Sequence, residues 1–99
     1  MISIEELFQT ARYCIKRDAI AELAAATLEW DSERKHLHLS FFLEGIAQDI
    51  DLGPLELAVT EIIAAHWKAI ETVGTSYVFD KTLLALALES PALIFTRPA

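Results

Sequence analysis

The residues of this sequence whose types and spacing could do chemistry are two histidines and a glutamate. His36 and His38 stand two positions apart in a segment where polar and apolar residues alternate, which is typical of a β-strand. On a strand this spacing places both imidazoles on one face, and Glu29 belongs to the preceding alternating segment. Two histidines and one carboxylate can hold a transition metal with open coordination positions. A further ligand at a suitable spacing is not evident, so this metal- or small-ligand site is our alternative prediction.

The distribution of charge is a second feature. The formal net charge is −7, and the interval between Lys35 and Lys68 contains neither Lys nor Arg. A local field of one sign attracts a basic partner and repels nucleic acid. We therefore predict a surface that binds a basic protein, and no binding of nucleic acid. The competing interpretation is an acidic surface that serves solubility alone. The carboxylates of the interval, which are the predicted partner-binding residues, are Glu44, Asp49, Asp51, Glu56 and Glu61.

Several catalytic motifs are missing from the sequence. Its three scattered glycines cannot form a phosphate-binding loop, and its single cysteine excludes a Cys-x-x-Cys motif and an intrachain disulfide. Asp49, Asp51 and Gly53 form only a fragment of a calcium loop. Cys14 and His66 fall on apolar helical stripes, where a small hydrophobe and a hydrogen-bonded core or boundary histidine are expected. We therefore predict a non-enzymatic protein without a cofactor.

Two amphipathic helices are expected to build the core. Apolar residues recur at helical spacing over 4–15 and over 55–70. Ser3 followed by Glu6 forms a capping box, which predicts that the first helix starts near Ile4. The 99 residues suffice for one domain with a single core.

The two alternating segments, 26–30 and 35–43, predict a β-hairpin with a four-residue turn between them. This pairing would set Glu29 beside His36 and Leu28 beside Leu37. One face of the hairpin is apolar and must be covered by another layer. The other face is polar and carries Thr27, Glu29, His36, His38 and Ser40.

The rest of the chain completes the predicted fold. Short strands are expected at 76–79 and 93–96, while 82–88 fits either a short helix or an apolar linker. The predicted class is α+β, with the element order αββαββ. We expect a four-stranded, mainly antiparallel sheet with two helices packed on one face.

Three observations bear on location and assembly. No apolar run approaches the roughly 20 residues of a membrane span, and the N-terminus lacks the features of a signal peptide. With a single cysteine, these observations favour a reducing cytoplasm. Hydrophobic residues make up 54% of the chain, so apolar surface around Leu83 to Leu88 is a candidate homodimer contact.

Parts of the sequence resemble a known family. The segments 28–31 (Leu-Glu-Trp-Asp), 37–45 (Leu-His-Leu-Ser-Phe-Phe-Leu-Glu-Gly) and 60–64 (Thr-Glu-Ile-Ile-Ala) are similar to small bacterial immunity proteins of the colicin and contact-dependent growth inhibition type. The resemblance covers about half of the chain. It implies a non-enzymatic cytoplasmic inhibitor that binds a toxin domain, often a basic nuclease. It carries over no functional residue.

The leading prediction is a small acidic protein-interaction module, an immunity- or antitoxin-like inhibitor that occludes a basic partner. The alternatives are a metal- or small-ligand-binding protein that uses the strand histidines, and a homo-oligomeric accessory subunit.

Overall fold

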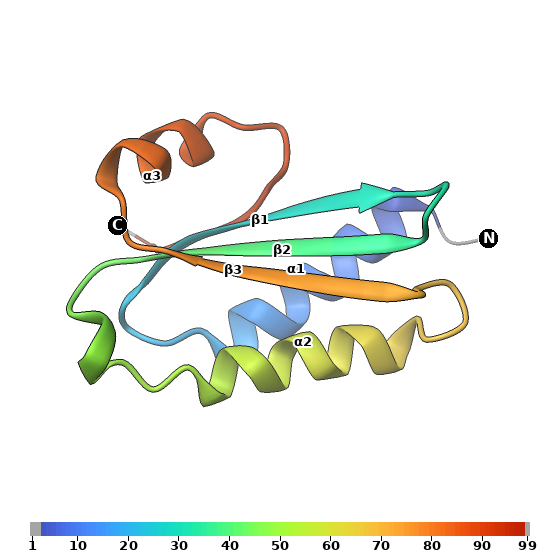
Figure 1. Cartoon of the computed structure of the whole chain (residues 1–99), viewed down its shortest axis with the longest axis horizontal. Helices are drawn as coiled ribbons and strands as arrows, with labels where there is room; N and C mark the ends of the chain where they lie inside the picture. Colours follow the sequence, from blue (N-terminus) through green and yellow to red (C-terminus); the bar gives the residue numbers. More distant parts are fainter. Residues whose placement is uncertain (1–2, 99) are drawn as a thin grey trace.

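The computed structural model describes residues 3–98 and shows an α+β fold with a four-stranded mixed sheet (Figure 1). The sheet has the strand order β3-β2-β1-β4. Pairs β1/β2 and β1/β4 are antiparallel, whereas β2 and β3 are parallel. In chain order the elements are α1 (Ile4–Asp18), β1 (Leu23–Asp31), β2 (His36–Leu43), the 3-10 helix η1 (Ala47–Asp49), α2 (Gly53–Ala65), β3 (Thr72–Val78), α3 (Lys81–Leu88) and β4 (Leu93–Thr96).

The first helix has the predicted position and cap. The Ser3 hydroxyl accepts a hydrogen bond from the Glu6 backbone N–H at 3.1 Å, which satisfies one of the free donors of the first turn. Acidic residues lie in the first turn and basic residues in the last, as the helix dipole favours. The buried stripe consists of Leu7, Ala11, Cys14 and Ile15.

The predicted hairpin is confirmed, but its predicted register is wrong. Glu29 lies opposite His38 rather than His36, and the four-residue turn is Ser32–Lys35. The Asp31 carboxylate accepts the backbone N–H groups of Glu33 and Arg34 at 3.0 and 3.2 Å, so it closes the turn one residue later than expected. Lys35 completes this turn in the left-handed region, with φ of 51°.

The predicted element order and the mainly antiparallel sheet need correction. The order is αββαβαβ, because residues 81–88 form a third α-helix whose first turn is capped by Asp80. The chain between β2 and β3 includes the 13-residue helix α2, which is long enough for a crossover that makes the two strands parallel. The strand predicted at 76–79 begins earlier, at Thr72, and Phe79 lies outside it.

The sheet separates two apolar clusters of different size. The large core lies between the sheet and the pair α1 and α2, as predicted for the face that carries Leu28, Leu39 and Phe41 (Figure 1). The opposite face is covered in part by α3, which sequence patterning had not placed there. The small cluster beneath α3 has Ala25, Phe42 and Ala87 as its buried members.

Candidate functional site

Polar side chains of three adjacent strands share the part of the sheet face that α3 leaves uncovered. Cross-strand register places Glu29 of β1 opposite His38 of β2, and Asp31 opposite His36. On the other side of β2, His36 is paired with Thr72 of β3. Each histidine of β2 therefore lies between β1, which carries the carboxylates, and β3, which carries the hydroxyl groups.

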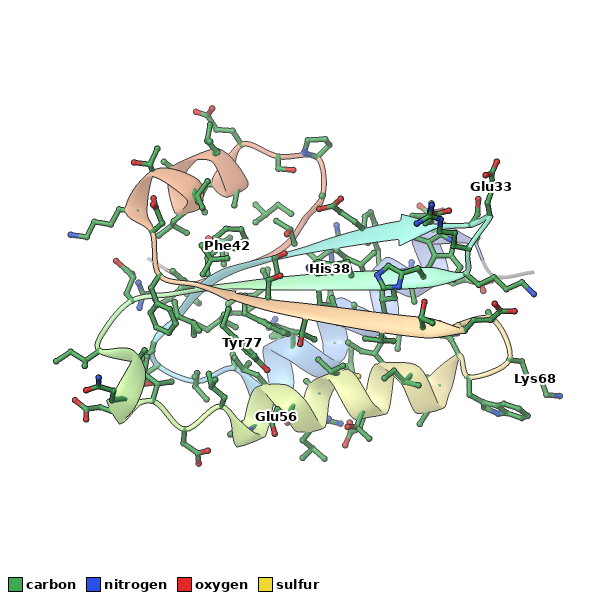
Figure 2. The ribbon with its side chains drawn as sticks, viewed as in Figure 1. Glu33, His38, Phe42, Glu56, Lys68 and Tyr77 are labelled. Carbon is green, nitrogen blue, oxygen red and sulfur yellow. The ribbon has the colours of Figure 1, made fainter. Side chains whose placement is uncertain are left out.

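Both histidines are held by hydroxyl groups of β3. His36 Nδ1 lies 2.7 Å from the Thr72 hydroxyl oxygen, and His38 Nε2 lies 2.8 Å from the Ser76 hydroxyl oxygen. The two rings are tilted, with centroids 6.2 Å apart. Figure 2 shows His38 extending over the sheet. These hydrogen bonds fix the ring orientation and leave each imidazole with one further nitrogen.

The alternative metal site lacks a ligand cluster. Within residues 3–98, no group of three or more His, Cys, Asp or Glu side chains is arranged to hold a metal ion. The structure brings Glu29 beside His38 but directs both histidines to hydroxyls of β3. This face of the sheet thus carries a row of polar side chains, in which His36 and His38 are hydrogen-bonded to β3.

The five predicted partner-binding carboxylates separate into two groups. Glu44 forms an ion pair with Arg97, and Glu61 forms one with Arg17, so these two serve contacts within the chain. Asp51 accepts the Gly53 backbone N–H at 2.9 Å and thereby forms an Asx turn just before α2. Within the described range, Asp49, Asp51 and Glu56 have no cationic partner. All three are exposed.

The three unpaired carboxylates belong to one end of the molecule. Figure 1 shows η1, the start of α2 and the ends of β2 and β3 at this end. We call it the acidic end and define it by Ile46, Asp49, Asp51, Glu56 and Phe79. Ile46 is 64% exposed and Phe79 is 40% exposed, and both are among several large apolar side chains that lie at the surface of the described chain. The acidic end therefore combines apolar anchors with negative charge.

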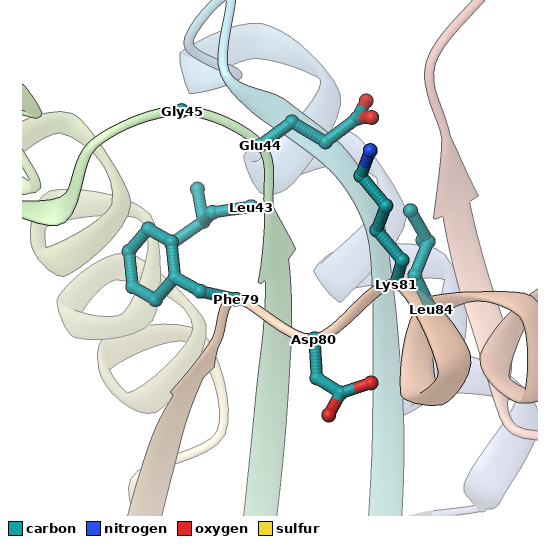
Figure 3. Close-up of a pocket in the computed structure, with 7 residues that line it drawn as sticks. All are labelled: Leu43, Glu44, Gly45, Phe79, Asp80, Lys81 and Leu84. Carbon is teal, nitrogen blue, oxygen red and sulfur yellow. The ribbon is translucent and has the colours of Figure 1, made fainter.

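A pocket of about 130 Å³ lies beside Phe79 at this end (Figure 3). Its walls come from the end of β2 and the start of α3. Figure 3 shows the Lys81 side chain pointing toward Glu44, and Asp80 pointing away from both. Gly45 forms part of the rim with φ of 128°, a conformation that L side chains rarely adopt.

The negative charge of the acidic end affects the pKa of Tyr77. Its ring stacks on Phe41 at a centroid distance of 5.7 Å, and Figure 2 shows its side chain pointing toward Glu56. Burial and the negative charge of Glu56 raise the pKa of Tyr77, against a smaller opposing effect of the Thr75 hydroxyl. The phenol therefore stays neutral and remains a hydrogen-bond donor.

The other singled-out residues have structural environments. His66 Nε2 lies 2.7 Å from the Thr10 hydroxyl oxygen at the boundary between α1 and α2, which confirms the prediction of a hydrogen-bonded boundary residue. Cys14 is buried, and its burial raises the pKa of the thiol. Neither side chain is presented as a nucleophile or base.

Sequence patterning missed the apolar members of the acidic end. The prediction includes Phe79 in a strand over 76–79 and gives neither Phe79 nor Ile46 a role in partner binding. The signal that was available is the position of both residues next to turn-forming segments, Gly45 before Ile46 and Asp80 after Phe79.

No family model matches the chain, and no curated protein matches its sequence significantly. In the described residues, no helix has both the length and the apolar content that a bilayer crossing requires.

Proposed function

We propose that this protein is a small non-enzymatic interaction module whose acidic end binds a basic partner protein. The observation that carries the proposal is the set of three exposed carboxylates, Asp49, Asp51 and Glu56, at the same end of the molecule as the exposed apolar residues Ile46 and Phe79. Apolar anchors surrounded by charge are the usual composition of a protein-binding patch.

The proposed mechanism is occlusion. The negative potential of the acidic end speeds encounter with a positively charged cleft, and the anchors then supply much of the affinity. Glu44 and Glu61 act differently in this proposal, because their ion pairs with Arg97 and Arg17 hold the surrounding elements in place. The resemblance to immunity proteins suggests a toxin domain as the partner, and this identification is part of the proposal.

The first test is association kinetics with a partner that is captured from the native cytoplasm and then purified. The triple variant Asp49→Asn/Asp51→Asn/Glu56→Gln removes three charges, while the asparagine at 51 can still accept the Gly53 N–H. We expect its association rate at low salt to fall about tenfold relative to the wild type, with a weaker dependence on salt.

The matched control is Glu5→Gln/Glu33→Gln/Glu71→Gln, which changes the net charge equally at exposed residues outside the acidic end. An equal loss of rate in both variants would mean that only overall charge matters. In that case the acidic end would not be the binding surface.

A further inference from the structure

The helix α3 covers only part of its sheet face and leaves a groove beside it. The groove has a volume of about 350 Å³ and is bounded by β1, β2, the end of β3, α3 and the segment before β4. Figure 1 shows α3 standing over this face, and Figure 2 shows Phe42 between the helix and the sheet. The residues that matter for the argument are Thr27, Glu29, Ser40, Phe42, Leu83 and Leu86.

Two hydroxyl groups on the floor of the groove form no side-chain hydrogen bond with the rest of the described chain. Thr27 and Ser40 lie opposite each other in the β1/β2 register, and both line the groove. Thr27 is only 7% exposed. Neither hydroxyl takes part in any of the side-chain hydrogen bonds formed between residues 3 and 98. By contrast, the neighbouring residues His36 and His38 are hydrogen-bonded to β3.

The two hydroxyls face the open groove and solvent, since no side-chain N or O atom of the described residues is both buried and without a hydrogen-bond partner. A molecule that enters the groove can therefore replace the water at these hydroxyls with hydrogen bonds of its own. Since a hydroxyl can donate and accept, the charge of that molecule must be decided by other residues.

The wall of the groove is apolar and exposed. Leu83 and Leu86 of α3 are 48% and 63% exposed although both line the groove. Phe42 and Val78 complete the apolar lining at the sheet. A ligand with an aliphatic or aromatic body would remove this surface from water, which favours binding.

The charge at the groove is negative. Glu29 lines it, is exposed, and forms none of the ion pairs of the described chain. Among residues 3–98, no lysine or arginine lines the groove. The carboxylate and the overall negative charge of the protein favour a cation and disfavour an anion.

We propose that this groove binds a small amphipathic ammonium compound. The apolar body of the ligand lies against Leu83 and Leu86, and its ammonium group lies at Glu29 and donates hydrogen bonds to the Thr27 and Ser40 oxygens. This inference rests on a different part of the molecule from the acidic end, so the two proposals stand or fall separately.

The test uses three probes with one body and three head groups: 4-phenylbutylammonium, 4-phenylbutan-1-ol and 4-phenylbutyrate. Binding is followed by amide and methyl chemical shifts in NMR titrations of the whole chain. We expect shifts at Thr27, Ser40, Leu83 and Leu86, and we expect the ammonium compound to bind about tenfold more tightly than the alcohol, with the carboxylate weakest.

Variants separate the contributions. Glu29→Gln should reduce the ammonium affinity to that of the alcohol, whereas Glu33→Gln, the same change in the exposed hairpin turn, should not. Leu86→Ser should weaken the ammonium compound and the alcohol alike, since it removes the shared apolar contact. The affinities are interpreted for variants whose circular dichroism and thermal unfolding match the wild type.

Three outcomes would overturn the proposal. These are shifts that map elsewhere on the wild type, equal affinity for the three probes, and an unchanged ammonium preference in Glu29→Gln. Sedimentation provides a further check, because a stable dimer that Leu86→Ser converts to a monomer would mean that a second copy, not a small molecule, occupies the groove.

Discussion

Gly74 determines how the His38 side chain packs on the sheet face. An added Cβ at Gly74 would lie 2.7 Å from His38 Nδ1, which is closer than real contacts allow, and 3.3 Å from His38 Cε1, which is tight. The His38 ring therefore crosses β3 at the one position in that strand without a side chain, and from there it reaches the Ser76 hydroxyl.

Gly74→Ala tests this packing. Because the imidazole must move or lose its hydrogen bond to Ser76, we expect the free energy of unfolding to fall by about 1–3 kcal/mol. In a His38→Ala background the new methyl group has space, so the same substitution should cost less than about 1 kcal/mol. Urea unfolding of the four proteins of this double-mutant cycle gives the coupling. Equal costs in both backgrounds would show that the glycine is needed for another reason.

For single residues, the sequence predicts which side chains share a face of a strand better than it predicts which residues they contact. Period-2 alternation correctly placed Glu29, His36 and His38 on one face of the hairpin. It could not identify Thr72 and Ser76 as their partners, because these residues come from a strand that follows a helix in the chain. The hairpin register also failed, since the Asx turn at Asp31 moves the pairing by two residues.

Of the three α-helices, α3 was the hardest to predict and has the fewest buried residues. Its sequence alternates leucine and alanine, which fits helix and strand alike. The cap was a usable signal: the Asp80 carboxylate accepts the N–H groups of Thr82 and Leu83 at 2.8 and 3.0 Å. Ala87 is its only buried residue. A helix with so little buried surface depends strongly on its cap.

Asp80→Ala should loosen α3 selectively. Loss of the two capping hydrogen bonds is expected to cost about 1 kcal/mol, which corresponds to a roughly fivefold faster hydrogen exchange of amides in 84–88. Asp80→Asn keeps an accepting oxygen and should change exchange much less. Amides of β1 and β2 serve as the internal reference. If the β1 and β2 amides accelerate equally, the cap stabilises the whole fold rather than the helix.

The parallel strand pair shows why element order alone was insufficient. An element order of helix, strand, strand, helix and strand is compatible with either direction of β3 beside β2. The deciding feature is the long connection through η1 and α2, which brings the chain back to the start of β2 before β3 begins. Backbone N–H groups of Glu71 and Thr72 bond to the Lys35 carbonyl oxygen and fix that starting point.

For the molecule as a whole, ion pairs connect segments that are distant in sequence. Arg17 of α1 binds Glu61 of α2 as well as its sequence neighbour Asp18, and Arg97 near the C-terminal end of the described chain binds Glu44. These contacts supplement a core that already packs α1 and α2 against the sheet. Exposed pairs of this kind add little stability individually, so their effect is best detected through its pH dependence.

Asp18 provides that readout. Its carboxylate accepts hydrogen bonds from Arg17 Nε and Nη2 at 3.0 and 2.9 Å, and this contact lowers its pKa below the ordinary value near 3.8, against an opposing effect of desolvation. Because the folded-state pKa is depressed, the contribution to stability is present above pH 3.8 and disappears as the pH falls through the folded value.

We therefore expect Asp18→Asn to be less stable than the wild type at neutral pH, and the difference to close in acid as the wild-type carboxylate becomes protonated. Urea unfolding followed by circular dichroism between neutral and strongly acidic pH measures this difference directly. Glu33→Gln, which removes an exposed carboxylate of the hairpin turn that forms none of the ion pairs found in residues 3–98, should show no comparable pH-dependent gap. A gap for Asp18→Asn that stays constant across the pH range would mean that the asparagine acts through packing, and that Arg17 does not stabilise the ionised carboxylate.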